Sequence, residues 1–231
     1  MDDHDAVTIS RGTYADYLAL ERFHYRSSSP ATRVRLLAAR DEGTGILAGV
    51  LVVSMPTLNG RWRDLAWPGE RPRDRRESAW WINREIRCLS RVIVEPRFRG
   101  QSIARRLVEA YLHAPDSPKT EAIAAMGAFC PFFVAAGMRE VMVERSFREH
   151  ALAEAFTFEG LHAWQCADVS HARRLVRRSA SLRRAITRWA RSSRATSRWC
   201  ERDEKSTERL VELACLGGST IVSPPRVFVW S

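Results

Sequence analysis

The chain has 231 residues, of which 45% are hydrophobic and 28% are charged. This length and composition predict one domain with a sizeable extension, or two small domains, and exclude collagen-like, disulfide-miniprotein and globally disordered chains. Lysine and arginine outnumber acidic residues by 37 to 27. The whole excess of ten matches the ten arginines between His171 and Cys200, a segment without Asp or Glu. Such a block points to a polyanion partner such as nucleic acid, or to a solvated helix face whose arginines pair with carboxylates elsewhere.

The cysteine pattern and the chain start bear on the cellular compartment. The five cysteines are odd in number and widely spaced, with no Cys-x-x-Cys, which favours reduced thiols over a disulfide framework. The start of the chain is acidic, unlike a signal peptide, and the longest apolar run, Ile46–Val53, is too short to cross a bilayer. We therefore expect a cytoplasmic protein without membrane association, and no spacing predicts a metal site.

The first half of the chain reads as strands with one helix and one long loop. Apolar, β-branched runs predict strands at Val7–Ser10, Val34–Ala39, Ile46–Ser54 and Ile86–Val94. The second and third of these strands form a hairpin. Helical spacing predicts a helix over Thr13–Tyr25. Pro56–Glu77, rich in proline, glycine and charge, is expected to be a long loop of the kind used as a lid or binding segment.

The second half begins with a helix and ends with a strand. A single-face apolar stripe predicts a helix over Gln101–His113. Three shorter elements are expected after it: strand Ala122–Met126, helix Phe129–Ala136 and strand Arg139–Glu144. The chain is then helical from His150 to about Leu216, with Gly217 and Gly218 as the break. Arg226–Trp230 is predicted to be a last strand paired beside Arg139–Glu144.

These elements predict an α/β fold: a mixed, mostly antiparallel sheet flanked by helices, with a basic helical insertion before the C-terminal strand. The expected boundaries are 1–148 for the core, 149–220 for the arginine-rich insertion and 221–231 for the strand that completes the sheet.

The strongest chemical signal is the strand–turn–helix run from Leu89 to Val108. A buried strand enters a short turn of small residues, where a helix begins with unpaired amide groups. These donors and the positive end of the helix favour an anion such as a pyrophosphate, to which Arg99 and Arg105 add charge-assisted contacts. Gly100–Ala104 also approximates the nucleophile elbow of α/β-hydrolases, but no Asp and His at later strand ends complete a triad.

The pattern Val94-x-Pro96-x-x-Arg99-Gly100-x-Ser102-x-Ala104 resembles motif A of the GNAT superfamily of acyl-CoA-dependent N-acyltransferases. The resemblance implies acetyl-CoA or another acyl-CoA as donor and an amine as acceptor. It implies that the strand around Val92, Ile93 and Val94 pairs with the acyl-pantetheine. It also implies that the pyrophosphate is held by Arg99, Gly100, Gln101, Ser102, Ile103, Ala104 and Arg105. Phe133 falls where that family often has a tyrosine that protonates the leaving thiolate, and phenylalanine cannot donate a proton.

A narrower resemblance involves Phe23-His24-Tyr25-Arg26, together with Asn83–Ile86, Leu89–Val92 and Met126–Phe133. These segments resemble a GNAT branch that includes domains attached to ABC-type ATPases and phage Mom-type DNA adenine-modification proteins. The resemblance implies His24 as general base and Tyr25 as general acid or orienting hydroxyl. The alternative for His24 is a histidine that interacts with the last carbonyls of a helix. Glu85 is a second candidate base, or a solvated flank of its strand.

Other residues carry two interpretations each. Cys130 is a nucleophile or a packing residue, and Trp80 and Trp81 stack on a base or pack under a lid. The sequence therefore predicts an acyl-CoA-dependent N-acyltransferase; the alternatives are a Mom-like enzyme that modifies adenine, or a non-catalytic nucleic-acid-binding module. In both alternatives the insertion holds phosphates through Arg173, Arg174, Arg177, Arg178, Arg184 and Arg188.

Overall fold

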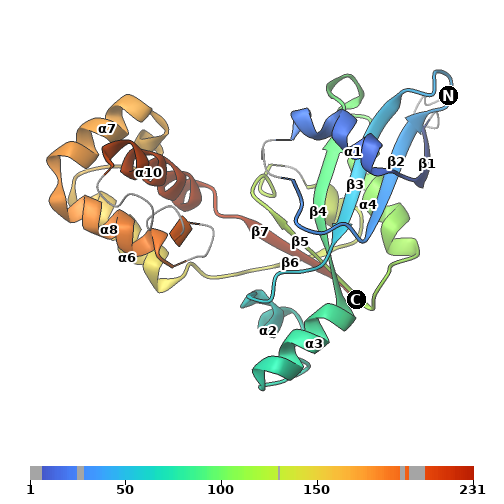
Figure 1. Ribbon diagram of the computed structural model, residues 1–231, viewed down its shortest axis with the longest axis horizontal. Coiled ribbons are helices and arrows are strands. Elements are labelled where there is room, and N and C mark those ends of the chain that lie inside the picture. Colours follow the sequence, from blue (N-terminus) through green and yellow to red (C-terminus); the bar gives the residue numbers. More distant parts are fainter. Residues whose placement is uncertain (1–6, 25–28, 130, 193–195, 198–205) are drawn as a thin grey trace. The chain divides into compact units, whose positions relative to one another are not determined.

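In the computed structural model, seven strands form one sheet in the order β1-β2-β3-β4-β5-β7-β6 (Figure 1). The structure describes residues 7–24, 29–129, 131–192, 196–197 and 206–231. Neighbouring strands are antiparallel, except that β4 and β5 are parallel. The strands are β1 Val7–Arg11, β2 Arg35–Asp41, β3 Leu47–Ser54, β4 Ile86–Val94, β5 Lys119–Ala124, β6 Arg139–Val141 and β7 Arg226–Trp230. The predicted α/β class with a mostly antiparallel sheet is confirmed, as is the pairing of β7 beside β6.

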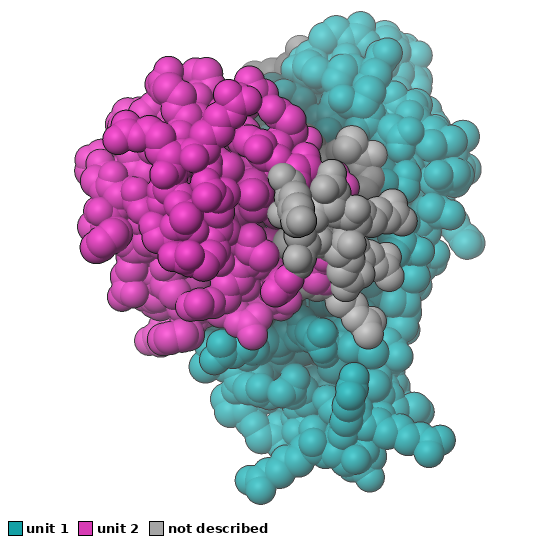
Figure 2. Space-filling view, turned by 60° about the vertical axis from the view of Figure 1, so that its left-hand side comes forward, with its two compact units in different colours: residues 1–143, 226–231 teal, residues 144–225 magenta. Residues whose placement is uncertain are grey.

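The chain divides into two compact units, coloured separately in Figure 2. Unit 1 comprises residues 1–143 and 226–231 and contains the sheet, and unit 2 comprises residues 144–225. Unit 2 is inserted in the sequence between β6 and β7. The predicted insertion, 149–220, lies inside unit 2, which is wider at both ends.

Helices cover both faces of the sheet in unit 1. They are α1 Tyr14–Leu20, η2 Glu21–Phe23, α2 Trp62–Ala66, α3 Arg75–Glu85, η3 Pro96–Phe98, α4 Ile103–His113 and α5 Phe132–Ala135. Alternate residues of β3 face opposite sides, because side chains alternate along a strand. Leu51 and Val53 pack with α4, whereas Val50 and Val52 pack with Tyr17 and Leu20 of α1. Helices α1 and α4 therefore lie on opposite faces.

The expected long loop at Pro56–Glu77 is wrong, because α2 and the first turn of α3 lie within it. The segment is ordered despite its prolines and glycines, because its apolar side chains are buried. Trp67, for example, lies in one buried cluster with Ile82 of α3. Helix α3 is also capped, because the Asp74 carboxylate accepts hydrogen bonds from the amides of Arg76 and Glu77 at 2.8 and 2.9 Å. The predicted helix over Thr13–Tyr25 is shorter than expected: α1 ends at Leu20 and continues as η2.

Unit 2 is helical and has a core of its own. Its elements are α6 Phe147–Phe158, η4 Ala163–Ala167, α7 Val169–Arg178, α8 Ala180–Ala190 and α10 Thr207–Val222. The predicted break at Gly217 and Gly218 is wrong, because α10 runs through both residues. A Cβ at Gly218 would lie 2.6 Å from the carbonyl oxygen of Ala163, so glycine allows η4 to pack closely against α10. Within the described residues, no helix has the length and apolar character needed to span a bilayer.

Candidate functional site

The sheet splits in its middle, between the two parallel strands. The ladder between β4 and β5 has three pairs, Ile86 with Lys119, Arg87 with Thr120 and Cys88 with Glu121. After Cys88, β4 continues to pair with β3, while β5 continues to pair with β7. The two strands therefore diverge toward their carboxyl ends, and the edge of β4 that faces β5 is left without a ladder partner among the described residues.

A bulge in β4 marks the start of the split. The register between β3 and β4 shifts so that Leu89 pairs with Val53 and Arg91 with Val52, which leaves Ser90 as the extra residue. Further along, the amide of Glu95 donates to the carbonyl of Ala48 at 2.9 Å. Because ladder bonds of an antiparallel pair alternate from residue to residue, the backbone groups of Val94 and Val92 face away from β3. They face the split, as required for pairing with an extended ligand.

The turn after β4 leaves several amides without backbone acceptors. Gly100 has φ +85° and Ser102 has φ +57°, a left-handed conformation that costs a serine about 1 kcal/mol. The side chain of Ser102 does not cap α4. The first amide of this helix to reach a backbone acceptor is that of Arg106, which donates to Ser102 at 3.0 Å. Within the described chain, the amides of Ile103, Ala104 and Arg105 thus remain available to an anion.

The split and the turn open into one pocket of about 910 Å³. Most of the predicted donor-binding residues line it: Val92, Ile93, Val94, Arg99, Gly100, Ser102, Ile103, Ala104 and Arg105. Gln101 is not among the lining residues. The wall on the β5 side is apolar and is formed by Ile123, Ala124, Ala125, Met126, Phe129, Phe132 and Phe133. Clefts of this size and lining are typical of small-molecule sites.

The pocket carries positive charge. Arg91, Arg99 and Arg105 line it, and no carboxylate does so among the described lining residues. Arg105 forms an ion pair with Glu109 at 2.7 Å, so part of its charge is already balanced. Arg99 is exposed, and its Nε lies 3.4 Å from the carbonyl oxygen of Val94. Together with the α4 amides, these arginines suit a ligand with at least two negative charges.

His24 also lines this pocket, although it follows η2 and lies far from β4 and α4 in the sequence. Of the described lining residues, it is the one whose side chain ordinarily titrates near neutral pH. Tyr25, its predicted partner, and Cys130 lie outside the described residues. Phe133 is buried and stacks on Phe228 with ring centroids 5.1 Å apart, so it is a packing residue.

The hydroxyl of Ser90 lies in the pocket lining but is already engaged. The Ser54 hydroxyl donates its proton to the carbonyl of Thr32 at 2.6 Å. The Ser90 hydroxyl can donate its single proton either to the Ser54 hydroxyl oxygen at 2.6 Å or to the carbonyl oxygen of Val52 at 3.1 Å. Its proton is thus not available to a ligand, which leaves His24 as the described residue best suited to proton transfer.

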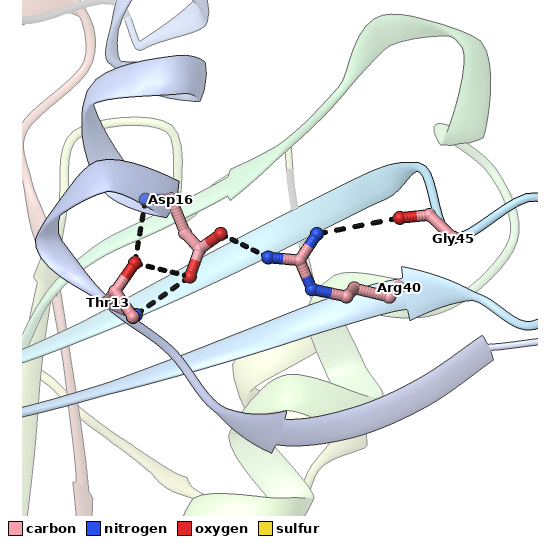
Figure 3. Close-up of polar contacts among 4 residues, drawn as sticks. All are labelled: Thr13, Asp16, Arg40 and Gly45. Carbon is pink, nitrogen blue, oxygen red and sulfur yellow. Dashed lines mark hydrogen bonds and ion pairs between the residues drawn. The ribbon is translucent and has the colours of Figure 1, made fainter.

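Helix α1 positions His24, and a polar cluster fixes the start of this helix (Figure 3). Thr13 and Asp16 form a capping box, and the Asp16 carboxylate also forms an ion pair with Arg40 of β2. Arg40 in turn donates to the carbonyl of Gly45 at 3.5 Å. Burial favours the neutral form of Asp16, but the hydrogen bonds from Thr13 and the charge of Arg40 outweigh burial and lower the pKa of Asp16.

A buried ion pair fixes the point from which the strands diverge. Glu121, opposite Cys88, accepts two hydrogen bonds from Arg63 of α2, at 2.9 and 2.7 Å, and one from Trp62 at 2.9 Å. Both charged side chains are fully buried. Burial, followed by the charge of Glu121, raises the pKa of the Cys88 thiol to about 12, which keeps it protonated. Sequence reasoning missed this cluster, because it placed Arg63 in a loop.

Three predicted candidates lie away from the pocket lining. Glu85 is the last residue of α3 and forms an ion pair with Arg84 at 3.1 Å, so the structure does not bring it to His24. Trp80 is 62% exposed, with the Arg84 guanidinium 5.0 Å from its ring centroid. Trp81 packs edge-on against Trp67, in agreement with the packing interpretation.

The predicted arginines of unit 2 fall into separate groups. Arg173 forms an ion pair with Glu208 at 2.6 Å, and Arg174 lies 3.1 Å from a ring nitrogen of His171. Arg177 and Arg178 are exposed at the end of α7. Arg184 and Arg188 line a second hollow, of about 740 Å³, with Arg148, Arg183, Thr187, Arg191 and Leu210. Arg148, outside the arginine-rich block, was not predicted.

The described residues contain no group of three or more His, Cys, Asp or Glu side chains that could hold a metal ion. Comparison of the chain with protein-family models and with curated proteins finds no match.

Proposed function

We propose that this protein is an acyl-CoA-dependent N-acyltransferase of the GNAT type. The single observation that carries the proposal is the split between β4 and β5, which leads into the uncapped start of α4 within one positively charged pocket. When bound, an acyl-CoA supplies an acyl group activated as a thioester. The chain offers the three features that such a donor requires: an open strand edge, an apolar wall and an anion site.

Each part of the pocket has a task in this proposal. The amides of Ile103, Ala104 and Arg105 bind the diphosphate, and Arg99 adds charge. The backbone groups of Val92 and Val94 bind the extended arm, and the Val92 amide donates to the developing oxyanion. His24 accepts the proton that the acceptor amine loses as its nitrogen bonds to the acyl carbon and the carbon–sulfur bond breaks.

Mass spectrometry of cells that express the chain tests this proposal. Proteins, small amines and nucleosides are compared between the natural chain, His24→Ala and a matched control, His113→Ala. His113 is exposed at the end of α4 and does not line the pocket. We expect an acyl-sized mass increase on one pool of amines with the natural chain and with His113→Ala, and its loss with His24→Ala.

The pool that gains mass identifies the acceptor. A modified adenine selects the Mom-like alternative, and a modified protein or small amine selects ordinary amine acylation. If no pool changes and isothermal titration with coenzyme A shows no heat, the transferase proposal is wrong and the non-catalytic binding module takes its place.

A further inference from the structure

The hollow in unit 2 gathers like charges from two helices. Its lining includes Arg148 of α6, three arginines of α8, Arg183, Arg184 and Arg188, and Arg191, the C-cap residue of α8. Thr187 and Leu210 complete the described lining, which contains no carboxylate. Among the described residues, no acidic side chain forms an ion pair with Arg148, Arg184 or Arg188. Within the described part of the chain, pairing with carboxylates therefore does not account for these three arginines.

Two features of these arginines are unfavourable for their helices: like charges adjacent on α8, and a cation at the start of α6. Arg184 and Arg188 are four residues apart on α8, and Arg191 follows three residues later, so like charges lie next to one another along one side. Arg148 lies in the first turn of α6, where the helix dipole disfavours a cation. Local rules broken together at one place indicate a function, because a bound anion would relieve both kinds of repulsion.

One arginine is held in place by the fold. The Arg183 guanidinium donates to the carbonyls of Val176 and Arg177 at 2.7 and 3.1 Å, at the end of α7. These bonds to terminal carbonyls of α7 hold the Arg183 side chain, which lines the hollow. This arrangement provides a preorganised positive group in the same lining as the exposed Arg184 and Arg188.

We infer that this hollow binds the phosphodiester backbone of a nucleic acid. From Arg184 to Arg191, this side extends about 10 Å at 1.5 Å per residue, a length that spans about three phosphates of one strand of a duplex, at about 3.4 Å per phosphate along the duplex axis. A single phosphate group would use only part of this row. A repeating polyanion engages all of it, and a concave surface suits a strand better than the plane of a bilayer. This inference is independent of the proposed acyl transfer and concerns unit 2 alone.

Fluorescence anisotropy with a labelled oligonucleotide of about 20 nucleotides, as single strand and as duplex, tests the inference on the full chain. The test variant carries Arg184→Gln and Arg188→Gln. The matched control carries Arg75→Gln and Arg76→Gln, which remove the same charge from exposed positions of α3 that do not line the hollow. Thermal melts verify that both variants are folded.

We expect the natural chain to bind the single strand, the duplex or both, with an affinity that falls as salt rises. The test variant should bind at least about tenfold more weakly at about 0.1 M salt. Its slope of log affinity against log salt should fall by about 1.4 to 1.8, because each lost phosphate contact contributes about 0.7 to 0.9. The control should lose less than about threefold.

Three results would overturn the inference. The first is no binding of either oligonucleotide at low salt. The second is an equal loss in the two variants, which would mean that net charge alone drives association. The third is binding to vesicles of anionic lipid that outcompetes the oligonucleotide with the same dependence on Arg184 and Arg188, which would make the partner a membrane surface.

Discussion

A glutamate substituted near the start of α4 should weaken binding of the proposed donor without destabilising the fold. Ala104 lines the pocket at the second residue of this helix. A glutamate there faces the positive end of the helix dipole, which stabilises the fold by about 0.3 to 1 kcal/mol. If the neighbouring amides bind the diphosphate as proposed, the same carboxylate would lie about 6 Å from it. At an effective dielectric constant of about 20, the repulsion between two unit charges at that distance is about 3 kcal/mol.

We therefore expect Ala104→Glu to bind coenzyme A at least about 100-fold more weakly than Ala104→Gln, which has the same shape without the charge. Isothermal titration measures the affinities, and thermal melts measure the stabilities. The melting temperature of Ala104→Glu should equal or exceed that of Ala104→Gln. If the two variants bind coenzyme A within about threefold of one another, the diphosphate does not lie at this helix terminus and the placement of the donor is wrong.

Three further predictions concern stability, measured as free energies of unfolding in urea. Glu121→Gln should cost about 3 to 5 kcal/mol, because it leaves the buried Arg63 charge unbalanced. Adding Arg63→Met to this variant should restore much of the lost stability. If the two substitutions together destabilise by the sum of their separate effects, the prediction is wrong. Because the folded-state pKa of Asp16 is lowered, its ionic contact with Arg40 stabilises above the unfolded pKa of about 3.9 and is lost as pH falls through the folded value. Asp16→Asn should thus destabilise at pH 7 and converge with the natural chain in acid, whereas a pH-independent difference would argue against the contact. Gly218→Ala should destabilise by about 1 to 3 kcal/mol despite the helix preference of alanine, and a gain would show that α10 and η4 are not in close contact.

The predictable parts of the fold are those that a short stretch of sequence determines. Strand β4 was predicted with the same bounds as in the structure, because its apolar run ends at Pro96. The terminal strand β7 was placed correctly, since strands at chain ends are held by pairing. The helices within Pro56–Glu77 were missed, because prolines and glycines concealed the apolar positions Trp62 and Trp67 that pack in the fold.

Where residue type alone suggests the wrong structure, tertiary packing determines the outcome. Gly217 and Gly218 are helix breakers by propensity, yet both are buried in α10, where side chains would collide with neighbouring elements. Similarly, the described arginines of one sequence block do not form one surface. Helical phase and ion pairing divide them, so that Arg173 is paired with Glu208 while Arg184 joins Arg148 from another helix.

The two halves of the candidate active site differ in how far a local stretch of sequence predicts them. The anion site is contiguous in sequence: the end of β4, Gly100, Ser102 and the first amides of α4 follow one another, so the motif alone indicates where a diphosphate fits. Proton transfer depends on separate segments instead. His24 reaches the pocket because α1 packs on β3, and α1 is held there by a contact between Asp16 and Arg40 that no local pattern contains. Under the proposed function, the donor site can therefore be placed from sequence before the catalytic base, because a phosphate requires adjacent backbone amides whereas a proton acceptor requires an assembled fold.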